Sequence, residues 1–443
     1  GLLLGERAEL PRSVDEAFRR AGVYHILAVS GSNVALIAGT VFLGLMLLKI
    51  PQRLVASVAS LVVVGYALVV GGQPSVLRAS AMGLLLLLGL LLDREVNPIN
   101  SLALAALGIL LWRPGDLWDP GFLLSFAATL GILWLTPPTM MLLESHGWPK
   151  WLAAGVAVSA SAQLAVTPIM LSHFNQLSLI GIAANLAVVP LAGLATTLGL
   201  AALLATLAWE GLGQLLFGSV WLVLLAIRAF VHGAASLPGA MVHLPAPHWS
   251  AVAAFFGLLA LLPRISRDRR TVFLAGVLAG WVLALSLWPW VRPADGLLRV
   301  TFLDVGQGDA VFVELPDGGR LLLDGGPGGE RRFDVGERVI APFLWNRAVA
   351  RLDVVAMSHS DPDHAGGLAA VLRRFRVGEF WDNGIWEAGS AELAWLVERS
   401  GAIKRSLRQG SRIWLGSALV TVLNPPGAPL RGSSRGPASD ENN

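Results

Sequence analysis

The sequence predicts a polytopic α-helical membrane domain followed by a smaller soluble α/β domain. Hydrophobic residues make up 54% of the 443 residues and charged residues only 14%, whereas soluble domains are about 25% charged. This apolar excess fills residues 23–292, and residues 297–443 have the composition of a soluble domain. Three parts are expected: an extramembrane amphipathic segment over 1–22, the membrane domain over 23–292 and the soluble domain over 297–443.

The first part is expected to form one short amphipathic helix. Ser13 and Glu16 have the spacing of a capping box at the start of a helix. Gly22 is suited to the position after its last turn, where glycine often ends a helix. This segment is too polar to be counted among the membrane spans.

A polar break follows, at the mouth of the first long apolar run, and consists of Ser30, Gly31 and Asn33. One interpretation is an ordinary helix boundary. The other is the lining of a pore or cavity, because irregular polar backbone at membrane depth has to face protein or water. The three residues are therefore candidates for a channel lining.

Ten apolar segments have lengths that fit membrane spans, although the shorter ones also fit re-entrant or interfacial helices. They cover residues 34–49, 54–72, 76–93, 98–112, 119–137, 150–171, 178–208, 214–236, 249–263 and 271–290. Ten spans are more than a simple anchor needs. The segments therefore predict a multi-pass membrane protein.

The basic residues of the loops predict an orientation. Arginines cluster between Arg264 and Arg270, directly before the last span, and such clusters favour the cytoplasmic side. The soluble domain would then lie outside the cytoplasm. The arginines of the first 20 residues fall on the outer side in this arrangement and count against it.

Four polar residues within the spans are further candidates for a channel lining, since polar groups inside a membrane are costly. They are Arg78, Gln163, Asn185 and Arg228. Arg78 lies at a span start, where its side chain can reach the interface instead, and Arg228 lies nearer the middle of its span. Polar side chains also hold helices together, so a structural role is an alternative for each of them.

After residue 297 the pattern changes to short strands separated by Gly-rich turns. Strands are expected over 298–303, 310–315, 320–323 and 352–357, and a helix over 334–346. Strands that end in Asp-Gly turns ahead of a helix predict a β-rich layer with helices on its outside. The soluble domain is therefore expected to be an α/β domain.

The turn after the strand over 352–357 carries the chemistry. It contains His359, Asp361, Asp363 and His364. Of the eight histidines in the chain, only His359 and His364 lie after residue 292. Imidazole nitrogens and carboxylate oxygens are ligands for divalent metals. The alternative is ordinary turn and helix-cap chemistry around Asp-Pro-Asp.

Two ions are the expected content of such a site, because one turn can present two ligand pairs, and paired ions can activate a water and clamp a phosphodiester. Asp304, Gln307, Asp309 and Asp324 are expected to orient these ligands or to shape the pocket floor, with turn formation as the alternative for Asp304 and Asp309. The chain has no cysteine, which excludes Cys-ligated zinc and leaves zinc and manganese open. Four ligands do not complete two sites, so either the site is degenerate or its other ligands lie beyond Asn443.

Several longer motifs are specific when they are taken together. They are Ala28–Val34, Gln73–Ala79, Asp119–Phe126, Gln163–Phe174 and Asn185–Pro190 in the membrane part, and Phe302–Ala310, Leu323–Gly326 and Ser358–His364 in the soluble part. With these motifs the chain resembles the ComEC family, whose members form the membrane channel for DNA uptake in natural competence. Two positions depart from common patterns. Asn33 stands where many relatives have His, and Asp361 stands where the wider metallo-β-lactamase superfamily has His, although Asp is usual in this family.

The resemblance implies a partial metallo-β-lactamase-like domain of αββα architecture in the soluble part. It implies a chain truncated at both ends, with an N-terminal soluble domain before Gly1 and a His-His-Gly-Ser motif after Asn443. It also implies a divalent-metal nuclease, in which Asp363 is catalytic and one DNA strand is hydrolysed while the other passes through the membrane. The chain of 443 residues is itself expected to be inactive.

The resemblance further implies a bacterial inner membrane location, an extracytoplasmic metal domain, DNA receptor proteins and a separate cytoplasmic ATP-dependent motor. The sequence has no Gly-Lys pair and thus no Walker A loop, which agrees with a separate motor. Two alternatives stay open. The metal domain is degenerate and only positions DNA, or the protein is a membrane-anchored hydrolase of a lipid or small phosphodiester.

Overall fold

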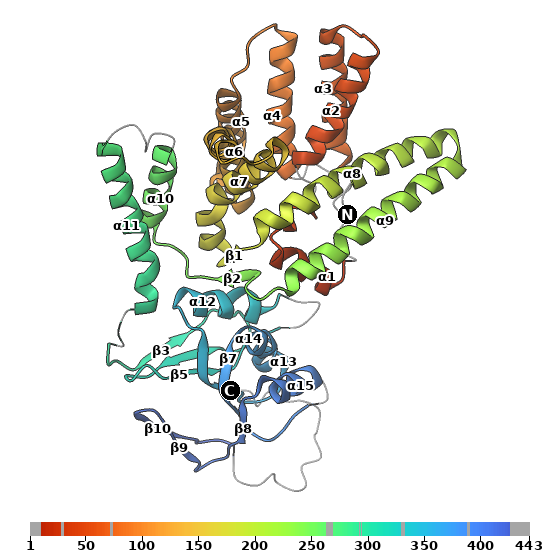
Figure 1. Cartoon of the computed structure of the whole chain (residues 1–443). Coiled ribbons are helices and arrows are strands. Elements are labelled where there is room, and N and C mark those ends of the chain that lie inside the picture. The colour runs from red at the N-terminus through yellow and green to blue at the C-terminus, as the bar shows by residue number, and fades with distance from the viewer. Residues whose placement is uncertain are drawn as a thin grey trace. The chain divides into compact units, whose positions relative to one another are not determined.

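A computed structural model of the chain describes residues 10–27, 31–70, 74–262, 269–291, 293, 295–328, 333–387 and 390–425. The chain divides into two compact units, Gly1–Ser286 and Leu287–Asn443 (Figure 1). The first unit is helical, and the second is built around a mixed β-sheet. The boundary expected from composition, between residues 292 and 297, lies a few residues after this division.

Every one of the ten apolar segments forms a helix. The apolar helices are α2 (Gly31–Leu47), α3 (Gln52–Val69), α4 (Pro74–Leu91), α5 (Pro98–Trp112), α6 (Pro120–Ser145), α7 (Lys150–Phe174), α8 (Gly181–Ala208), α9 (Glu210–Ser236), α10 (Trp249–Leu261) and α11 (Arg269–Val291). Among the described residues, six helices are long and apolar enough to cross a membrane by length and composition, namely α3, α6, α7, α8, α9 and α11. The other four are shorter apolar helices, as expected for part of the set.

The expected helix in the first segment is present, but its predicted capping box is wrong. Helix α1 (Arg12–Arg20) begins after Pro11, and no side chain caps it, so Ser13 lies inside the helix. Proline has a fixed φ near the helical value and can begin a helix without a side-chain cap. Gly22 follows the last turn with φ +74°, as predicted, and Ala17 and Phe18 are buried where α1 packs against α9.

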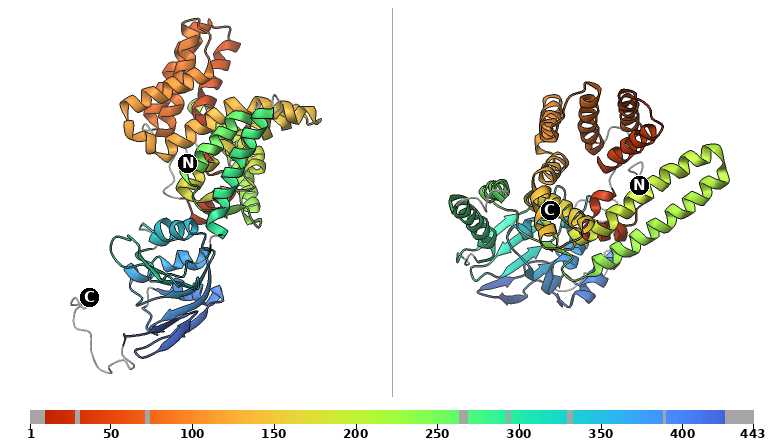
Figure 2. Two further views of the ribbon diagram at one scale, coloured as in Figure 1. Left: turned by 90° about the vertical axis from the view of Figure 1, so that its left-hand side faces the viewer. Right: turned by 45° about the horizontal axis from the view of Figure 1, so that its top comes forward.

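Small residues allow the long helices to pack closely in pairs. Along α7, Ala153, Ala157, Ser161 and Ala165 are buried at four-residue spacing, and a Cβ at Gly131 of α6 would overlap Ala165. Close backbone approach of this kind is how helices associate in lipid. Helices α8 and α9 form a second antiparallel pair (Figure 2, right). Many of their large apolar side chains are exposed, as a lipid-facing surface requires.

The second unit contains one six-stranded mixed sheet. Its strands are β3 (Arg299–Phe302), β4 (Val311–Glu314), β5 (Arg320–Leu323), β6 (Arg351–Ala356), β7 (Arg376–Asp382) and β8 (Ile403–Ser406), in the order β3-β4-β5-β6-β7-β8. Strand β4 is antiparallel to both of its neighbours, β3 and β5. The pairings from β5 to β8 are all parallel. The four strands expected from sequence are β3 to β6, and the expected helix over 334–346 is a π-helical turn (Gly336–Ile340) continued by α12 (Ala341–Asn346).

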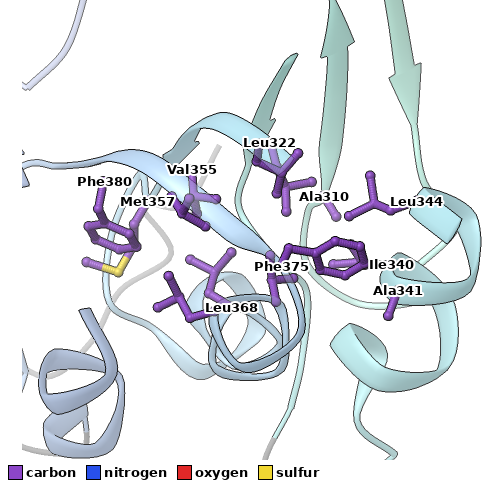
Figure 3. Close-up of a cluster of buried hydrophobic side chains, with 14 of the residues drawn as sticks. Ala310, Leu322, Ile340, Ala341, Leu344, Val355, Met357, Leu368, Phe375 and Phe380 are labelled. Atoms are coloured by element: carbon purple, nitrogen blue, oxygen red, sulfur yellow. The ribbon is translucent and has the colours of Figure 1, made fainter. Parts of the chain in front are cut away.

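Helices cover one face of this sheet and enclose the core of the unit. They are α12, α13 (Pro362–Ala365), α14 (Leu368–Arg374) and α15 (Ala391–Ser400). Phe312, Leu322, Val355 and Phe380 stand side by side on neighbouring strands and are fully buried. Figure 3 shows Leu322, Val355 and Phe380 of this row together with Leu368 of α14. On the opposite face Phe302 stays 77% exposed, so the described residues provide a single helical layer.

A small hairpin, β9 (Arg412–Leu415) and β10 (Ala418–Thr421), is attached to the sheet through Asp317. The carboxylate of Asp317 accepts hydrogen bonds from the backbone N–H of Gly319 in its own turn (3.1 Å) and of Ser417 in the hairpin turn (2.5 Å). These bonds stabilise the charged form and lower the pKa of Asp317 below its ordinary value of 3.8. One carboxylate therefore joins two turns that are distant in sequence.

We expect Asp317→Ala to increase amide hydrogen exchange throughout residues 412–421, because the hairpin loses its bond to the sheet. A carboxyl group whose pKa is lower in the folded than in the unfolded protein stabilises the fold at pH values above its unfolded pKa. The contact of Asp317 in the wild type is therefore kept above pH 3.8 and lost as the pH falls through the lower pKa of the folded protein. Exchange measured by mass spectrometry, corrected for its intrinsic pH dependence, checks both statements. Asp295→Ala serves as the control, and equal protection in both variants contradicts the assignment.

Candidate functional site

Three loops of the second unit meet at one edge of its sheet. Strands β3, β5 and β6 run in the same direction, since β4 is antiparallel to both β3 and β5 and β6 is parallel to β5. The loops that follow them, 304–309, 324–328 and 358–367, therefore leave the same edge. Ligand and catalytic groups of α/β sheets gather at the carboxyl ends of strands in this way.

Glycines bring the backbones of these loops into direct contact. Gly308 has φ +98°, and a Cβ there would overlap the carbonyl oxygen of Asp363. The N–H of Gly325 donates to the carbonyl of His364 (2.6 Å), and that of Gly326 donates to the carbonyl of Asp309 (2.8 Å). The loops consequently form one rigid layer beneath the predicted metal ligands.

Asp324 lies at the centre of this layer and is buried, with 3% of its surface exposed. One carboxylate oxygen accepts from the backbone N–H of Ser358 (2.7 Å). The other accepts from the hydroxyl of Ser358 (2.6 Å) and lies 3.1 Å from Nδ1 of His364. These contacts place Asp324 directly behind one of the predicted ligands, and the Nδ1 proton of His364 is held toward this carboxylate.

The same carboxylate also orients His359, through Ser358. The Ser358 hydroxyl oxygen lies 2.8 Å from Nδ1 of His359. Because that hydroxyl donates its own proton to Asp324, it accepts the Nδ1 proton of His359. Both imidazoles therefore keep a lone pair on Nε2, which is the state that a metal ligand needs.

The two imidazole rings stand close together, with centroids 4.0 Å apart. Nε2 of His359 is buried and has no hydrogen-bond partner among the residues that the structure describes, which is an unfavourable state for a polar atom without a ligand. It lies 3.6 Å from a carboxylate oxygen of Asp361, and Nε2 of His364 lies 3.9 Å from one of Asp363. Two ligands of one tetrahedral zinc ion lie roughly 3.4 Å apart.

The donor chemistry and spacing of these pairs fit a divalent metal in part. Within the described residues, no three or more His, Asp, Glu or Cys side chains converge into a group that could hold an ion. The turn therefore supplies two ligand pairs and no complete metal site. Asp361 begins α13 without a side-chain cap bond, so the alternative of helix-cap chemistry does not account for its carboxylate.

The remaining predicted pocket residues differ from Asp324. Asp304 is exposed, and its carboxylate accepts a long bond from the N–H of Gly306 (3.4 Å), which is the turn role given above as its alternative. Asp309 is 69% exposed and lies 3.9 Å from Nδ1 of His364. Gln307 is exposed on the same loop. The 304–309 loop thus lies next to the ligand turn, but its polar side chains are exposed and do not gather around the predicted ligands.

A loop that the sequence analysis did not single out holds the ligand turn from the other side. Asn383, directly after β7, donates to the carbonyl of Ser358 (3.0 Å), and the N–H of Glu387 donates to the hydroxyl of Ser360 (3.0 Å). The loop is fixed by Asp382, which is buried and accepts from Ser406 (2.6 Å) and the Trp386 indole (2.9 Å). An Asp-Asn-Gly turn at a strand end was the available signal.

Three of the predicted channel residues, Gly31, Asn33 and Arg78, gather at one end of the membrane unit, and a fourth, Ser30, lies outside the described residues. Gly31 begins α2, and a Cβ there would lie 3.1 Å from that of Ala79 on α4. Asn33 is buried and hydrogen-bonded to the side chain of Tyr66 on α3. Arg78, the neighbour of Ala79, is 5% exposed.

The other three predicted channel residues have separate surroundings. Gln163 donates to the carbonyl of Ser178 (2.8 Å) and so joins α7 to the short strand β1 (Gln176–Ser178). The side-chain oxygen of Asn185 on α8 is buried without a hydrogen-bond partner in the described part of the chain. Arg228, the candidate nearer the middle of its span, is exposed on α9.

Comparison with known proteins identifies relatives of both units. Residues 2–268 match the sequence profile of the family described as Competence protein, and residues 303–434 match that of the Metallo-beta-lactamase superfamily. Proteins of that superfamily generally use divalent metals. No solved structure matches the chain.

Three curated relatives match along most of the chain. ComE operon protein 3 of Bacillus subtilis is 29% identical over 394 residues, which covers 85% of the chain and 49% of that protein. Recombination protein 2 of Haemophilus influenzae is 25% identical over 84% of the chain and 52% of that protein. Competence protein ComA of Neisseria gonorrhoeae is 29% identical over 88% and 53%. The chain thus spans about half the length of the curated relatives it matches.

We expect Asp324→Asn to loosen the ligand turn, because an amide nitrogen then faces the donors of Ser358 and His364. Asparagine also tolerates the positive φ of this position (+57°). The free energy of local opening at residues 354–367 should fall by about 1–3 kcal/mol, the usual cost of an unpaired buried polar group. The affinity of the chain for Zn²⁺ or Mn²⁺ should fall roughly 10–100-fold.

Hydrogen exchange and isothermal titration with each metal check this prediction. Asp304→Asn is the matched control, since that carboxylate is exposed and accepts one long bond. Equal effects of the two substitutions would contradict the central role of Asp324.

Proposed function

The chain belongs to the competence protein family, and from that premise we propose that it forms part of the membrane path by which DNA enters the cell during competence. The resemblance to the ComEC family is confirmed. So is the fold class, a helical membrane part followed by a mixed-sheet domain that matches the metallo-β-lactamase superfamily. The six long apolar helices and the family make the chain a multi-pass membrane protein.

The observation that carries the proposal is the polar end of the cluster formed by α2, α3 and α4. Asn33 and Arg78 are buried there within helices that are otherwise apolar. Buried polar and charged groups are costly in a membrane and mark paths for polar substrates. A single helix is sufficient for an anchor, so this number of helices with interior polar groups favours transport over anchoring.

The second unit is proposed to act on the DNA that enters that path. His359, Asp361, Asp363 and His364 would hold one or two divalent ions, zinc or manganese, together with further ligands. A bound divalent metal supplies an activated water and stabilises charge on a phosphodiester. Asp324 and Ser358 keep the Nδ1 protons of both histidines away from the ligand side, and Asp363, 45% exposed, accepts the proton of the attacking water.

The partners of the complete protein follow from this proposal. Double-stranded DNA meets the protein at the outer face of a bacterial inner membrane, one strand is degraded and the other passes through. DNA receptor proteins deliver the substrate, and a separate ATP-dependent motor in the cytoplasm moves the strand. The sequence contains no Walker A loop of its own.

One observation favours a second candidate function for the second unit. Because no group of three or more ligands converges in the described residues, the domain in this second case binds or positions DNA without cleaving it. The membrane path is the same under both candidates. Cleavage by the full-length protein separates them.

In the full-length protein, we expect His364→Ala to abolish metal-dependent DNA cleavage, since it removes one Nε2 ligand and leaves Asp324 without its imidazole partner. Gel analysis of labelled DNA with Mn²⁺ or Zn²⁺, and with chelator, measures this. His146→Ala, an exposed histidine of the first unit, is the control and should cleave normally. Unchanged cleavage by His364→Ala would rule out the catalytic role, and no cleavage by the wild type would favour the second candidate.

The soluble domain is proposed to lie outside the cytoplasm, on the basis of the arginines that precede the last helix, of which Arg269 and Arg270 begin α11. Protease added to intact spheroplasts should therefore remove an epitope placed in the 383–387 loop. An epitope in the turn between α9 and β2 (Met241–His243) provides a second reference point. Protection of the first epitope until the spheroplasts are lysed would reverse the proposed orientation.

A further inference from the structure

The guanidinium of Arg78 is the least satisfied charge in the membrane unit that the structure describes. The residue is 5% exposed, and its Nε and Nη1 atoms are buried without a hydrogen-bond partner among the described residues. The nearest carboxylate oxygen, of Asp119, lies 3.8 Å from Nη1, beyond hydrogen-bond distance. A buried charge in this state is costly unless a ligand completes it.

Asp119 does not complete it, because the same oxygen has another role. Asp119 is the N-cap of α6, and its Oδ1 accepts the backbone N–H of Phe122 at 2.8 Å. Its side chain is 46% exposed, so the carboxylate stands at the rim of the site rather than inside it. Arg78 and Asp119 therefore form an ion pair without a hydrogen bond. Nε and Nη1 of Arg78 have no hydrogen-bond acceptor among the described residues.

The arginine is aimed at the first turn of α6. A Cβ at Gly121 would lie 3.3 Å from Nη2 of Arg78, so the guanidinium lies against the backbone of that turn. The 26-residue helix α6 directs its partial positive charge and its free N–H groups to this end. A fixed guanidinium beside a helix N-terminus is a binding site for an anion with several oxygens.

Neighbouring helices add to the positive character of this end. Gly31, the first residue of α2, packs against Ala79 of α4, and Arg78 of α4 packs against Gly121 of α6. The N-termini of α2, α4 and α6 thus lie at the same end of the unit. Asp119 is a carboxylate of this neighbourhood, and Asp116 in the preceding turn (Pro114–Trp118) is a second one that acts on Arg78 at longer range.

We propose that Arg78 and the first turn of α6 form a binding site for a phosphodiester anion, occupied by successive phosphates of the DNA strand that crosses the membrane. This site rests on the proposed transport of DNA. Asp119 acts as the internal anion of the empty site and competes with each arriving phosphate. Such competition keeps the affinity low enough for release, which passage along a strand requires.

The test uses the purified full chain in lipid nanodiscs and a short fluorescent single-stranded oligonucleotide. Binding is measured by anisotropy over a range of salt concentrations. Arg78→Gln should weaken binding roughly tenfold or more, in line with the loss of a charged hydrogen-bonding group, and should reduce the slope of log affinity against log salt by about 0.7. Arg78→Lys should be intermediate, since lysine keeps the charge without the forked geometry.

Asp119→Asn should change affinity in the opposite direction and tighten binding. Asparagine caps a helix as well as aspartate does, so the substitution removes the competing charge and keeps the bond to Phe122. If Arg78 and Asp119 were only a structural ion pair, both substitutions would act in the same direction, and that result overturns the proposal. Should Arg78→Gln not fold, Arg78→Lys and Asp119→Asn give the same decision.

The source of the phosphodiester is identified by two further arms. An oligonucleotide with uncharged methylphosphonate linkages should show no difference between wild type and Arg78→Gln. If raising the phosphatidylglycerol content displaces DNA from the wild type and not from Arg78→Gln, the site binds a lipid headgroup, and the DNA assignment is wrong. Arg94→Gln, an exposed arginine in the segment after α4, is the matched control and should bind like the wild type.

A transformation assay in cells separates this site from the proposed function. Normal DNA uptake after deletion of the whole gene would refute the transport function itself. Uptake that is lost on deletion but normal with Arg78→Gln would refute only the phosphate site.

Discussion

The carboxylate of Asp324 is the interaction on which the candidate metal centre depends. It receives the backbone and hydroxyl groups of Ser358 and faces Nδ1 of His364, and through Ser358 it also sets the tautomer of His359. One buried charge thereby fixes two predicted ligands, one before the short helix α13 and one within it. Carboxylate–histidine pairs of this kind increase ligand basicity and fix ring orientation. The glycine contacts of the three loops hold Asp324 where it can do this.

The two units treat buried charge in opposite ways. In the second unit, Asp324 and Asp382 are each surrounded by donors, so burial rigidifies the loops around the ligand turn. In the first unit, Arg78 is buried with open donors at the N-terminus of α6. A satisfied charge is a structural element, whereas an unsatisfied one has unused binding capacity. The first arrangement suits a fixed catalytic or binding layer, and the second suits ligands that arrive and leave.

Sequence alone predicted the elements whose patterns are local. Apolar runs located the ten apolar helices of the described residues, and alternation located strands β3 to β6, because lipid and core each impose a repeating pattern on neighbouring residues. The ligand turn was visible because its four side chains lie within six residues. The role of Asp324 depends on partners 34 and 40 residues away, and that of Asp382 on partners across the sheet. Such contacts follow from strand order, which the sequence pattern does not specify.

The geometry of the second unit links its fold to its chemistry at one edge. Leu323, the last residue of β5, directs its side chain to the face of the sheet opposite the helices and is 37% exposed. Phe302 at the end of β3 lies on the same face and is more exposed. The chain leads from these strand ends into the ligand layer, at Asp324 directly after β5 and in the 304–309 loop one residue after the end of β3. Among the described residues, the apolar surface without cover and the ligand pairs without a third member therefore adjoin the same strand ends. Any group that covers this face near β3 and β5 would adjoin the strand ends from which the ligand layer starts, so closing the sheet and completing the metal site concern the same edge.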